Sequence, residues 1–367
     1  MKFNPQLRDL SLIAVISILG TFGFAYIAYV ILENKYPDSI ISIWNVWDTQ
    51  HYTAIAQYGY TSSTVDKRHL QIVFLPLYPY IIKIFSIVFR DYLLSALLVS
   101  NLAFAGAIIY FFKLVRLDYD IEDSFRSVIY LSVFPTALFL HAAYTESLFM
   151  ALSIACFYYA RKEKWALAGL IGMLAAATRI TGIILLPVLV IEYLNQKGFQ
   201  LKSVRKNILW LSLITLGIIF YLGINYVTFG DPFKFLEIQE KHWSKHLDFP
   251  YKGFLYALGG IAWRTPSEAM YAGWGELAFA ILGLALIIYS FFRIRLSYCL
   301  YALATWFLVT STWFWLSIPR YTLSMFPIFI ALALLGRHRV VNYLVLFISI
   351  TLYALLLIQF IRFGWAF

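Results

Sequence analysis

Charged residues are scarce in this sequence. Of its 367 residues, 13% are Asp, Glu, Lys or Arg, while 62% are hydrophobic and 19% are aromatic. Soluble domains carry about 25% charged residues, and a water-soluble chain of this size needs a polar surface that so few charges do not supply. The composition excludes a soluble globular protein and indicates a protein whose solvent is the lipid bilayer.

Cysteines and the common motifs of soluble enzymes are scarce too. Cys156 and Cys299 both lie within apolar segments, which excludes a disulfide framework and a cysteine-based zinc site. The sequence has no Walker loop, no dinucleotide-binding fingerprint and no Ser-His-Asp order. Its net charge of +10 comes mainly from Lys and Arg in loops at helix ends, so we expect membrane lipids as partners and no nucleic acid.

Long apolar runs, separated by short loops that hold the charges, predict an all-α polytopic membrane protein. We expect about 11 transmembrane helices in one integral-membrane domain over residues 1–367, with the N-terminal run kept as an anchor. The predicted segments cover about residues 10–31, 92–115, 125–143, 145–160, 166–177, 180–195, 207–228, 271–292, 296–316, 322–336 and 340–361.

Residues 72–90 form a further apolar run, which Pro76 and Pro79 open and Lys83 interrupts. If this run stays on the outer side, the short basic linkers all lie in the cytosol, as the positive-inside rule requires; if it spans, they all move outside. We therefore interpret it as a re-entrant or interfacial helix. Large outer loops then remain at about 32–91 and 229–270, and the first is rich in Trp, Tyr and polar residues, which favours a functional loop.

The first outer loop contains the sharpest motif, which runs from Trp47 to Tyr60. On a helix, Asp48 shares a face with His51 and Tyr52, so a carboxylate and an imidazole lie together beside aromatic side chains. Such a pair can take a proton from a hydroxyl, or hold a divalent cation such as Mg²⁺ or Mn²⁺, although the residues identify no metal ligands. The alternative is an interfacial helix with aromatic anchors and a solvated Asp48.

Three more charged residues are predicted at the outer ends of helices. Glu146 follows Thr145 at a helix start, where it either contacts substrate or caps the helix. Arg179 lies between two short helices, and Arg320 lies at the top of a helix pair. Each arginine either binds a phosphate or reaches to lipid headgroups, and Glu146 is the alternative anionic partner for Arg179.

The second outer loop contains His242 and His246, spaced four residues apart as in a helical metal site. No Glu follows in the pattern of zinc peptidases. We therefore favour a polar helix in which His242 contacts substrate.

The candidate residues of the two outer loops and of the outer helix ends all lie on the predicted non-cytosolic side, whereas nucleotide sugars and ATP are cytosolic. An outward-facing enzyme therefore needs an energised donor that arrives within the membrane. A lipid-linked phosphosugar meets that need.

These motifs resemble the PIG-V family of integral-membrane mannosyltransferases, in the glycosyltransferase C superfamily. The resemblance rests on Trp47-Asp48-x-x-His51-Tyr52, Phe-x-Pro-x-x-Pro at 74–79, Tyr144-Thr145-Glu146-Ser147, Thr178-Arg179-x-Thr181-Gly182 and Pro319-Arg320-Tyr321, in that order along most of the chain. It implies a many-helix fold with a large first outer loop. It also implies inverting transfer of mannose from a polyprenyl (dolichyl-type) phosphate donor to a hydroxyl of a lipid or glycan acceptor, as in glycolipid or GPI-like biosynthesis.

The resemblance makes Asp48 the essential loop acid and places Glu146, Arg179 and Arg320 in other family motifs. We expect Asp48, oriented or polarised by His51, to take the acceptor proton. Arg179 and Arg320 are expected to neutralise the departing phosphate.

Aromatic residues of the loop complete the predicted site. Trp47 and Tyr52 are expected to stack on the sugar or the prenyl chain. The family often has a basic residue just before Trp-Asp, and this sequence has Val46 there. Another residue must then supply that phosphate contact, or the contact is absent.

The alternative function is a transporter or flippase of lipid-linked sugars, since charges and broken helices in the membrane suit it equally. The lack of an inverted repeat and the one-sided polar groups favour the enzyme. The compact chain favours a prokaryotic plasma membrane with the active site facing outside, or the endoplasmic reticulum lumen in a eukaryote.

Overall fold

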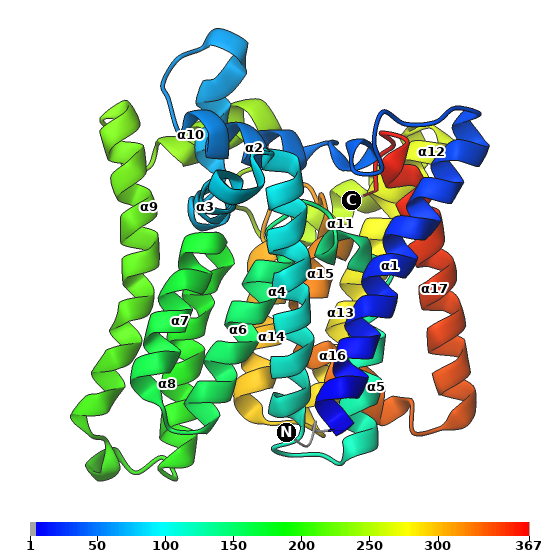
Figure 1. Cartoon of the computed structure of the whole chain (residues 1–367). Helices are drawn as coiled ribbons and strands as arrows, with labels where there is room; N and C mark the ends of the chain where they lie inside the picture. The colour runs from blue at the N-terminus through cyan, green and yellow to red at the C-terminus, as the bar shows by residue number, and fades with distance from the viewer. Residues whose placement is uncertain (1–4, 367) are drawn as a thin grey trace. The chain divides into compact units, whose positions relative to one another are not determined.

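The computed structural model describes residues 5–366, which fold into helices joined by turns and loops (Figure 1). Within this range there is no β-strand, and extended pairing is limited to an isolated bridge between Leu247 and Thr312. The predicted all-α polytopic fold is confirmed.

Five helices within residues 5–366 are long and apolar enough to cross a membrane, which marks the chain as an integral membrane protein. A sixth span is reached if α15 (Ile318–Ser324) and α16 (Pro327–Leu335), which meet at 85°, count as one broken helix. The five are α1 (Pro5–Glu33), α4 (Tyr92–Val115), Lys206–Phe229 with α9 (Leu213–Phe229), Met270–Phe291 with α13 (Glu276–Phe291), and α17 (Arg339–Ile361).

The predicted number of about 11 spans is not confirmed, because several predicted segments form shorter helices. The segment 125–143 breaks where α5 (Ile121–Ser132) ends, just before Pro135, since the residue before a proline avoids the helical conformation. Other segments form helices below the about 20 residues that span a bilayer. They are α6 (Glu146–Arg161), α7 (Trp165–Thr178), α8 (Leu185–Gln196) and α14 (Leu296–Thr310).

The apolar run at 72–90, which Lys83 interrupts, forms α3 (Leu77–Phe89), a helix of 13 residues. At 1.5 Å per residue it is about 20 Å long, against a hydrocarbon core of about 30 Å. A helix of this length enters or lies along a membrane without crossing it.

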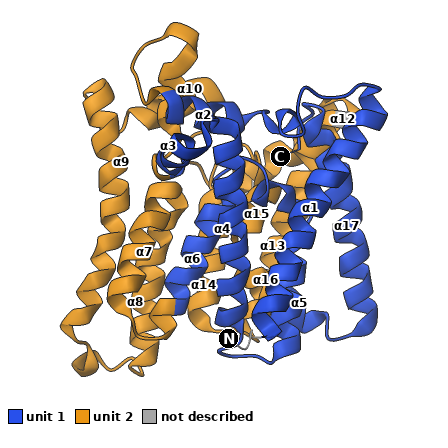
Figure 2. Ribbon diagram, viewed as in Figure 1, with its two compact units in different colours: residues 1–57, 78–158, 332–366 blue, residues 58–77, 159–331, 367 orange. Residues whose placement is uncertain are grey.

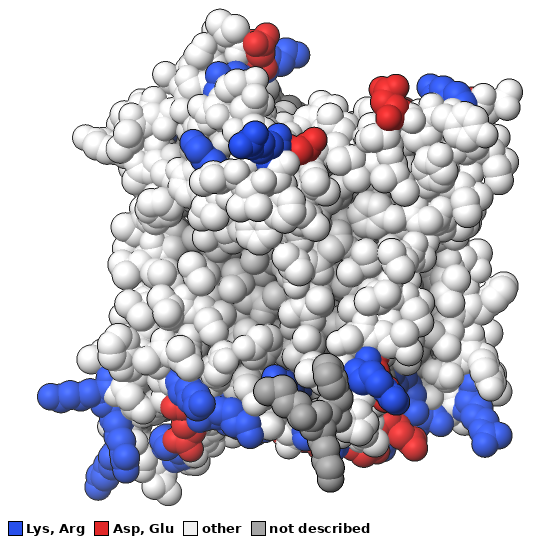
Figure 3. All heavy atoms as spheres, viewed as in Figure 1, with Lys and Arg blue, Asp and Glu red and all other residues white. Residues whose placement is uncertain are grey.

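The chain folds as two compact units, which are described separately (Figure 2). The first comprises residues 5–57, 78–158 and 332–366, and the second comprises residues 58–77 and 159–331. In Figure 3 the charged side chains visible on this face lie near helix ends.

In the first unit, ionic contacts join two basic linkers at one end. The buried Asp123, near the start of α5, accepts from Arg337 at 2.6 Å and pairs with Arg126 at 2.5 Å. Hydrogen bonding to Asp123 raises the pKa of the Arg337 guanidinium above its ordinary value. The linkers that follow α4 and α16 therefore share one end of this unit.

In the second unit, the buried carboxylate of Glu192 pairs with arginines from two basic linkers, the one after α6 and the one after α13. Glu192 of α8 is fully buried and lies 2.8 Å from Arg295 and 3.7 Å from Arg161. Lys197 pairs with Glu163 at 2.8 Å beside it. Because α7 begins and α13 ends near these linkers, Thr178 and Glu276 lie at the opposite end of the unit.

Close packing of α7 against α9 fixes the position where α7 ends. A Cβ atom at Gly217 would lie 2.2 Å from the carbonyl oxygen of Met173, and one at Gly169 would lie 2.0 Å from that of Trp210. Gly217 brings α9 against the backbone of α7, and Gly169 brings α7 against the segment Lys206–Ser212 that leads into α9, so glycine is required at these points. This rigid pair carries Arg179 at its end.

Candidate active site

In the first unit, Asp48 begins α2 (Asp48–Tyr58), where a carboxylate is favoured by the helix dipole. Its backbone N–H donates to the Tyr144 hydroxyl at 3.2 Å. Tyr144 is itself buried, and its carbonyl accepts from the Ser100 hydroxyl at 3.1 Å. The start of α2 is therefore held by the packed core rather than by the loop alone.

Trp47 directly precedes Asp48 and adopts a left-handed backbone conformation with φ at +51°. This region costs a bulky residue about 1–3 kcal/mol, and such strain gathers at functional sites. The Trp47 indole makes an edge-to-face contact with Trp365, at 5.5 Å between ring centroids, which keeps the turn in place. The Trp47 side chain is 41% exposed and so has a free surface for a ligand.

The structure brings His51 and Asp48 together on the first turn of α2. Burial lowers the pKa of His51 below its ordinary value, and the nearby Asp48 carboxylate opposes that shift. At neutral pH, His51 is therefore a neutral imidazole beside a half-buried carboxylate. This pair can orient a hydroxyl and accept its proton.

Tyr52 lies beneath this site rather than on its surface. Its side chain is 5% exposed and makes ring contacts with Tyr78 at 5.2 Å and Tyr144 at 6.4 Å. Burial gives Tyr52 a packing role in supporting α2, and its ring does not offer the stacking surface that we expected from the sequence.

Glu146 begins α6 and is 2% exposed. It follows Tyr144, the residue that meets the backbone of Asp48, by two positions. The first unit thus holds Trp47, Asp48 and His51 at the start of α2, where the backbone contacts Tyr144, two residues before Glu146.

In the second unit, cationic side chains converge on Tyr321. The Arg179 guanidinium, just past the end of α7, lies 5.3 Å from the Tyr321 ring centroid. The Lys245 ammonium lies 4.9 Å from the same centroid and donates to the Tyr321 hydroxyl at 3.4 Å. Arg320 directly precedes Tyr321 on α15. We call Arg179, Lys245, Arg320 and Tyr321 the cationic cluster.

A buried carboxylate holds the backbone at the start of the helix that carries Arg320 and Tyr321. Glu276 is fully buried, and its two oxygens accept from the backbone N–H groups of Ser317 and Ile318, at 2.7 Å each. Ser317 has φ at +69°, and α15, which carries Arg320 and Tyr321, starts immediately after it. Glu276 itself follows a π-helical segment, Met270–Gly275, a rare conformation that is common at functional sites.

Lys245, Tyr321 and Glu276 were not predicted as site residues. Tyr321 stands inside a motif that we noted, and Glu276 is an acidic residue at the start of an apolar run, which is itself a signal in membrane proteins. Lys245 gives no such signal, because only the folded loop brings it to Tyr321.

His242 does not form a helical pair with His246. The helix α10 (Lys234–Trp243) ends before His246, at Ser244 with φ at +51°. His242 instead contacts His69 at 5.7 Å between ring centroids, and His246 stacks on Trp313. No group of three or more His, Cys, Asp or Glu within residues 5–366 is placed to hold a metal ion.

Comparison with known proteins gives a family model that matches part of the chain, and a fold. The family described as dolichyl-phosphate-mannose-protein mannosyltransferase matches residues 75–224. No curated protein matches the chain significantly.

The solved structures that resemble the chain include ArnT and an archaeal oligosaccharyltransferase. ArnT from Cupriavidus metallidurans, bound to undecaprenyl phosphate, has a TM-score of 0.57 at 13% identity, over 89% of this chain and 60% of its own. The oligosaccharyltransferase of Archaeoglobus fulgidus, in complex with Zn and sulfate, has a TM-score of 0.51 at 14% identity, over 98% of this chain and 53% of its own. The chain shares their fold and spans little more than half of their lengths.

Proposed function

We propose that this chain is a glycosyltransferase of the C superfamily that transfers a sugar from a polyprenyl phosphate to an acceptor hydroxyl. The matched family is described by transfer from dolichyl-phosphate mannose, and ArnT, which shares the fold, binds undecaprenyl phosphate. The single observation that carries the proposal is the cationic cluster, because Arg179 and Lys245 both lie against the Tyr321 ring, and positive side chains gathered at a helix break favour an anionic ligand.

The cationic cluster suits a phosphate that leaves with increased negative charge. Arg179 and Arg320 supply planar donors that match phosphate oxygens, and Lys245 supplies a point charge. The Tyr321 hydroxyl adds a neutral donor. Fixed charges of this kind stabilise a developing anion without moving during the reaction, which is worth about 10²–10³ in rate per donor.

Asp48 suits the other half of the reaction. In the proposed step, the acceptor oxygen forms a bond to the anomeric carbon as the bond from that carbon to the phosphate oxygen breaks. The acceptor proton passes to Asp48, and the polyprenyl phosphate departs with the bonding electrons. One displacement inverts the anomeric centre, and neutral His51 orients the Asp48 carboxylate.

Mannose as the sugar, a PIG-V-like acceptor and an outward-facing site are the finer parts of the proposal. The description of the matched family supports mannose. In the second unit, the basic linkers gather at the end opposite the cationic cluster, which supports an outward-facing cluster by the positive-inside rule. Trp47, with its exposed indole, is our candidate for contact with the sugar.

Transfer from radiolabelled polyprenyl-phosphate mannose tests this proposal. Purified wild type and Asp48→Asn are incubated side by side with the donor and a membrane lipid extract, with polyprenyl-phosphate glucose as a second donor. We expect a new glycosidic product from wild type alone. If labelled donor crosses the bilayer of reconstituted vesicles without any product, the chain is a transporter and the proposal is wrong.

A further inference from the structure

The backbone N–H of Asp48 begins α2 without a capping residue directly before it. The N–H groups that begin a helix find no partner within that helix, and a Ser, Thr, Asp or Asn just before the helix often accepts one of them. Val46 and Trp47 stand there instead, and neither side chain can accept a hydrogen bond. The N–H of Asp48 therefore needs an acceptor from another part of the chain.

Tyr144, 96 residues further along the chain, supplies that acceptor. Its hydroxyl oxygen lies 3.2 Å from the Asp48 nitrogen and accepts the N–H. The next two N–H groups of α2 donate within the turn, to the carbonyls of Val46 and Trp47, at 3.2 Å each. The turn therefore satisfies those two groups itself, and Tyr144 satisfies the N–H of Asp48.

Packing keeps the Tyr144 ring in place. The side chain is 2% exposed, and its ring centroid lies 5.2 Å from that of Phe139 and 5.9 Å from that of Phe360. Tyr52, one turn further along α2, adds a ring contact at 6.4 Å. A side chain enclosed in this way offers no surface to a substrate, so it can influence a reaction only through the residues that it touches.

The helix α4 holds the backbone of the segment that carries Tyr144. The Ser100 hydroxyl donates to the carbonyl of Tyr144 at 3.1 Å and bonds the Tyr78 hydroxyl at 2.7 Å. The side-chain amide of Asn101, the next residue, donates to the carbonyl of His141 at 3.1 Å. Neighbouring residues of one long helix thus hold both ends of the segment from His141 to Tyr144.

We propose that Tyr144 is a positioning residue for sugar transfer, whose hydroxyl sets the place of the Asp48 carboxylate, and that Ser100 acts through Tyr144. The inference rests on the proposed function, in which Asp48 takes the acceptor proton. Trp47 adopts a left-handed backbone conformation that bulky residues rarely keep, so the loss of a hydrogen bond beside it lets the turn relax. A displacement of about 1 Å near the reacting groups can cost about 10²-fold in rate.

Removing only the hydroxyl tests the inference. Tyr144→Phe keeps the ring and takes the acceptor away from the Asp48 N–H. With rates normalised to the active fraction, we expect kcat to fall about tenfold or more, while the KM values for donor and acceptor stay within about twofold of wild type. A wild-type kcat in Tyr144→Phe would overturn the inference.

Tyr353→Phe is the matched control in the same unit. It removes a hydroxyl that bonds the Thr21 hydroxyl at 2.6 Å between α17 and α1. Because a hydrogen bond is lost in both variants, both should have a lower melting temperature. We expect Tyr353→Phe to keep the wild-type kcat, and an equal fall of kcat in the two variants would assign the effect to stability and overturn the inference.

A double-mutant cycle tests the part played by Ser100. Ser100→Ala releases the carbonyl of Tyr144, and we expect it to lower kcat severalfold alone but to add little to the loss in Tyr144→Phe, since residues that act through one another are not additive. Additive losses would exclude Ser100 from the proposed chain of contacts. If Tyr144→Phe fails to fold, Ser100→Ala takes its place, and an unchanged kcat in that variant overturns the inference.

Hydrogen exchange at residues 47–50 supplies a measurement that needs no activity. Tyr144→Phe should speed the exchange of these amides about fivefold or more, because a neutral hydrogen bond at the start of α2 is lost. Unchanged exchange in this variant would show that the hydroxyl does not hold the turn, which also overturns the inference.

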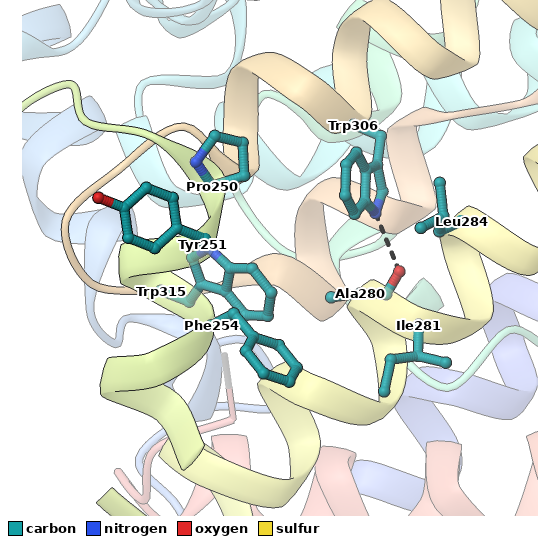
Figure 4. Close-up of a pocket in the computed structure, with 8 residues that line it drawn as sticks. All are labelled: Pro250, Tyr251, Phe254, Ala280, Ile281, Leu284, Trp306 and Trp315. Carbon is teal, nitrogen blue, oxygen red and sulfur yellow. Dashed lines mark hydrogen bonds between the residues drawn. The ribbon is translucent and has the colours of Figure 1, made fainter. Parts of the chain in front are cut away.

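Trp306→Phe is the control for hydrogen exchange, in the second unit. The Trp306 indole of α14 donates to the carbonyl of Ala280 of α13 at 2.9 Å, beside a pocket that both residues line (Figure 4). The variant loses one hydrogen bond from a side chain to the backbone, as Tyr144→Phe does. It should leave the exchange at residues 47–50 at the wild-type rate, and faster exchange there would assign the effect to general destabilisation.

The outcomes separate the two proposals. If wild type transfers sugar and Tyr144→Phe exchanges faster yet keeps its kcat, the positioning role is wrong and the proposed function stands. If Tyr144→Phe exchanges faster but wild type transfers sugar from no lipid donor, Tyr144 holds the turn and the transferase is wrong.

Discussion

Glu276 holds the strained turn at Ser317. The carboxylate accepts the Ser317 N–H at 2.7 Å, and Ser317 lies in the left-handed region at φ +69°, which costs a non-glycine residue energy. The same carboxylate accepts the N–H of Ile318. A buried acid on α13 therefore fixes the start of the short helix that presents Arg320 and Tyr321.

Replacing this acid by its amide should weaken donor binding. In Glu276→Gln, one side-chain group accepts a backbone N–H, while the NH₂ group faces the other N–H and leaves it unpaired, at a cost of about 1–3 kcal/mol. We expect a lower melting temperature in detergent and a raised donor KM with a smaller change in kcat. Ser317→Gly in the same chain should recover part of the stability, because glycine adopts this φ without strain.

A purely structural role for Glu276 gives a different result. Melting temperature and total active fraction would then fall together, and the donor KM of the remaining active enzyme would stay at the wild-type value. That outcome would remove Glu276 from the positioning of the cationic cluster.

Asp48→Asn should abolish most turnover while the fold persists. A placed general base contributes about 10²–10⁴ in rate, and the amide cannot accept the proton. The measurement is single-turnover sugar transfer with equal amounts of folded protein. Asp38→Asn, an exposed acid of the same loop, serves as the control and should keep full rate. Near-normal transfer by Asp48→Asn would contradict our assignment of the base.

The rate of transfer should fall in acid as His51 gains a proton. Burial lowers the pKa of His51, so the neutral form persists below the ordinary value of 6.5, and the fall in kcat/KM should begin at a pH below that value. The fold loses stability in the same direction, because the unfolded chain binds a proton to His51 before the folded chain does. A pH–rate profile checks this, and His51→Asn should change its acid limb. An identical limb in that variant would assign the titration to another group.

Lys245 should contribute to phosphate binding as much as the predicted arginines. We expect Lys245→Met and Arg179→Met each to weaken inhibition by free polyprenyl phosphate about tenfold or more, because a charge-assisted hydrogen bond is worth about 1.5–3 kcal/mol. Lys241→Met is the matched control, since Lys241 lies on α10 and pairs with Glu237 at 2.6 Å. Equal inhibition of the Lys245 and Lys241 variants would exclude Lys245 from the anion site.

Helical class and local motifs were readable from the sequence because they depend on composition and short spacing. Asp48 and His51 lie one turn apart, so a helix brings them together whatever surrounds it. The span count was not readable, since apolar runs such as 166–177 do not reveal whether they cross alone or pack as short helices. Lys245 and Tyr321 are 76 residues apart, and their meeting depends on tertiary packing.

Two aromatic residues that the sequence analysis treated alike differ in their burial in the structure. Trp47 and Tyr52 are aromatic residues of one motif, yet the first is 41% exposed and the second 5%. The difference arises from the left-handed turn at Trp47, which no local pattern predicted, because tryptophan rarely adopts that conformation.

The ionic contacts of Glu192 have a consequence for biogenesis. Arg161 precedes Glu192 in the chain, but Arg295 and Ser297, which hold its other oxygen at 2.8 and 2.6 Å, are synthesised 103 and 105 residues later. A nascent chain that has inserted α8 therefore carries an incompletely neutralised acid until α14 emerges. Assembly of the second unit is completed only after translation has passed residue 297, and chains truncated before that point should be substrates for membrane quality control.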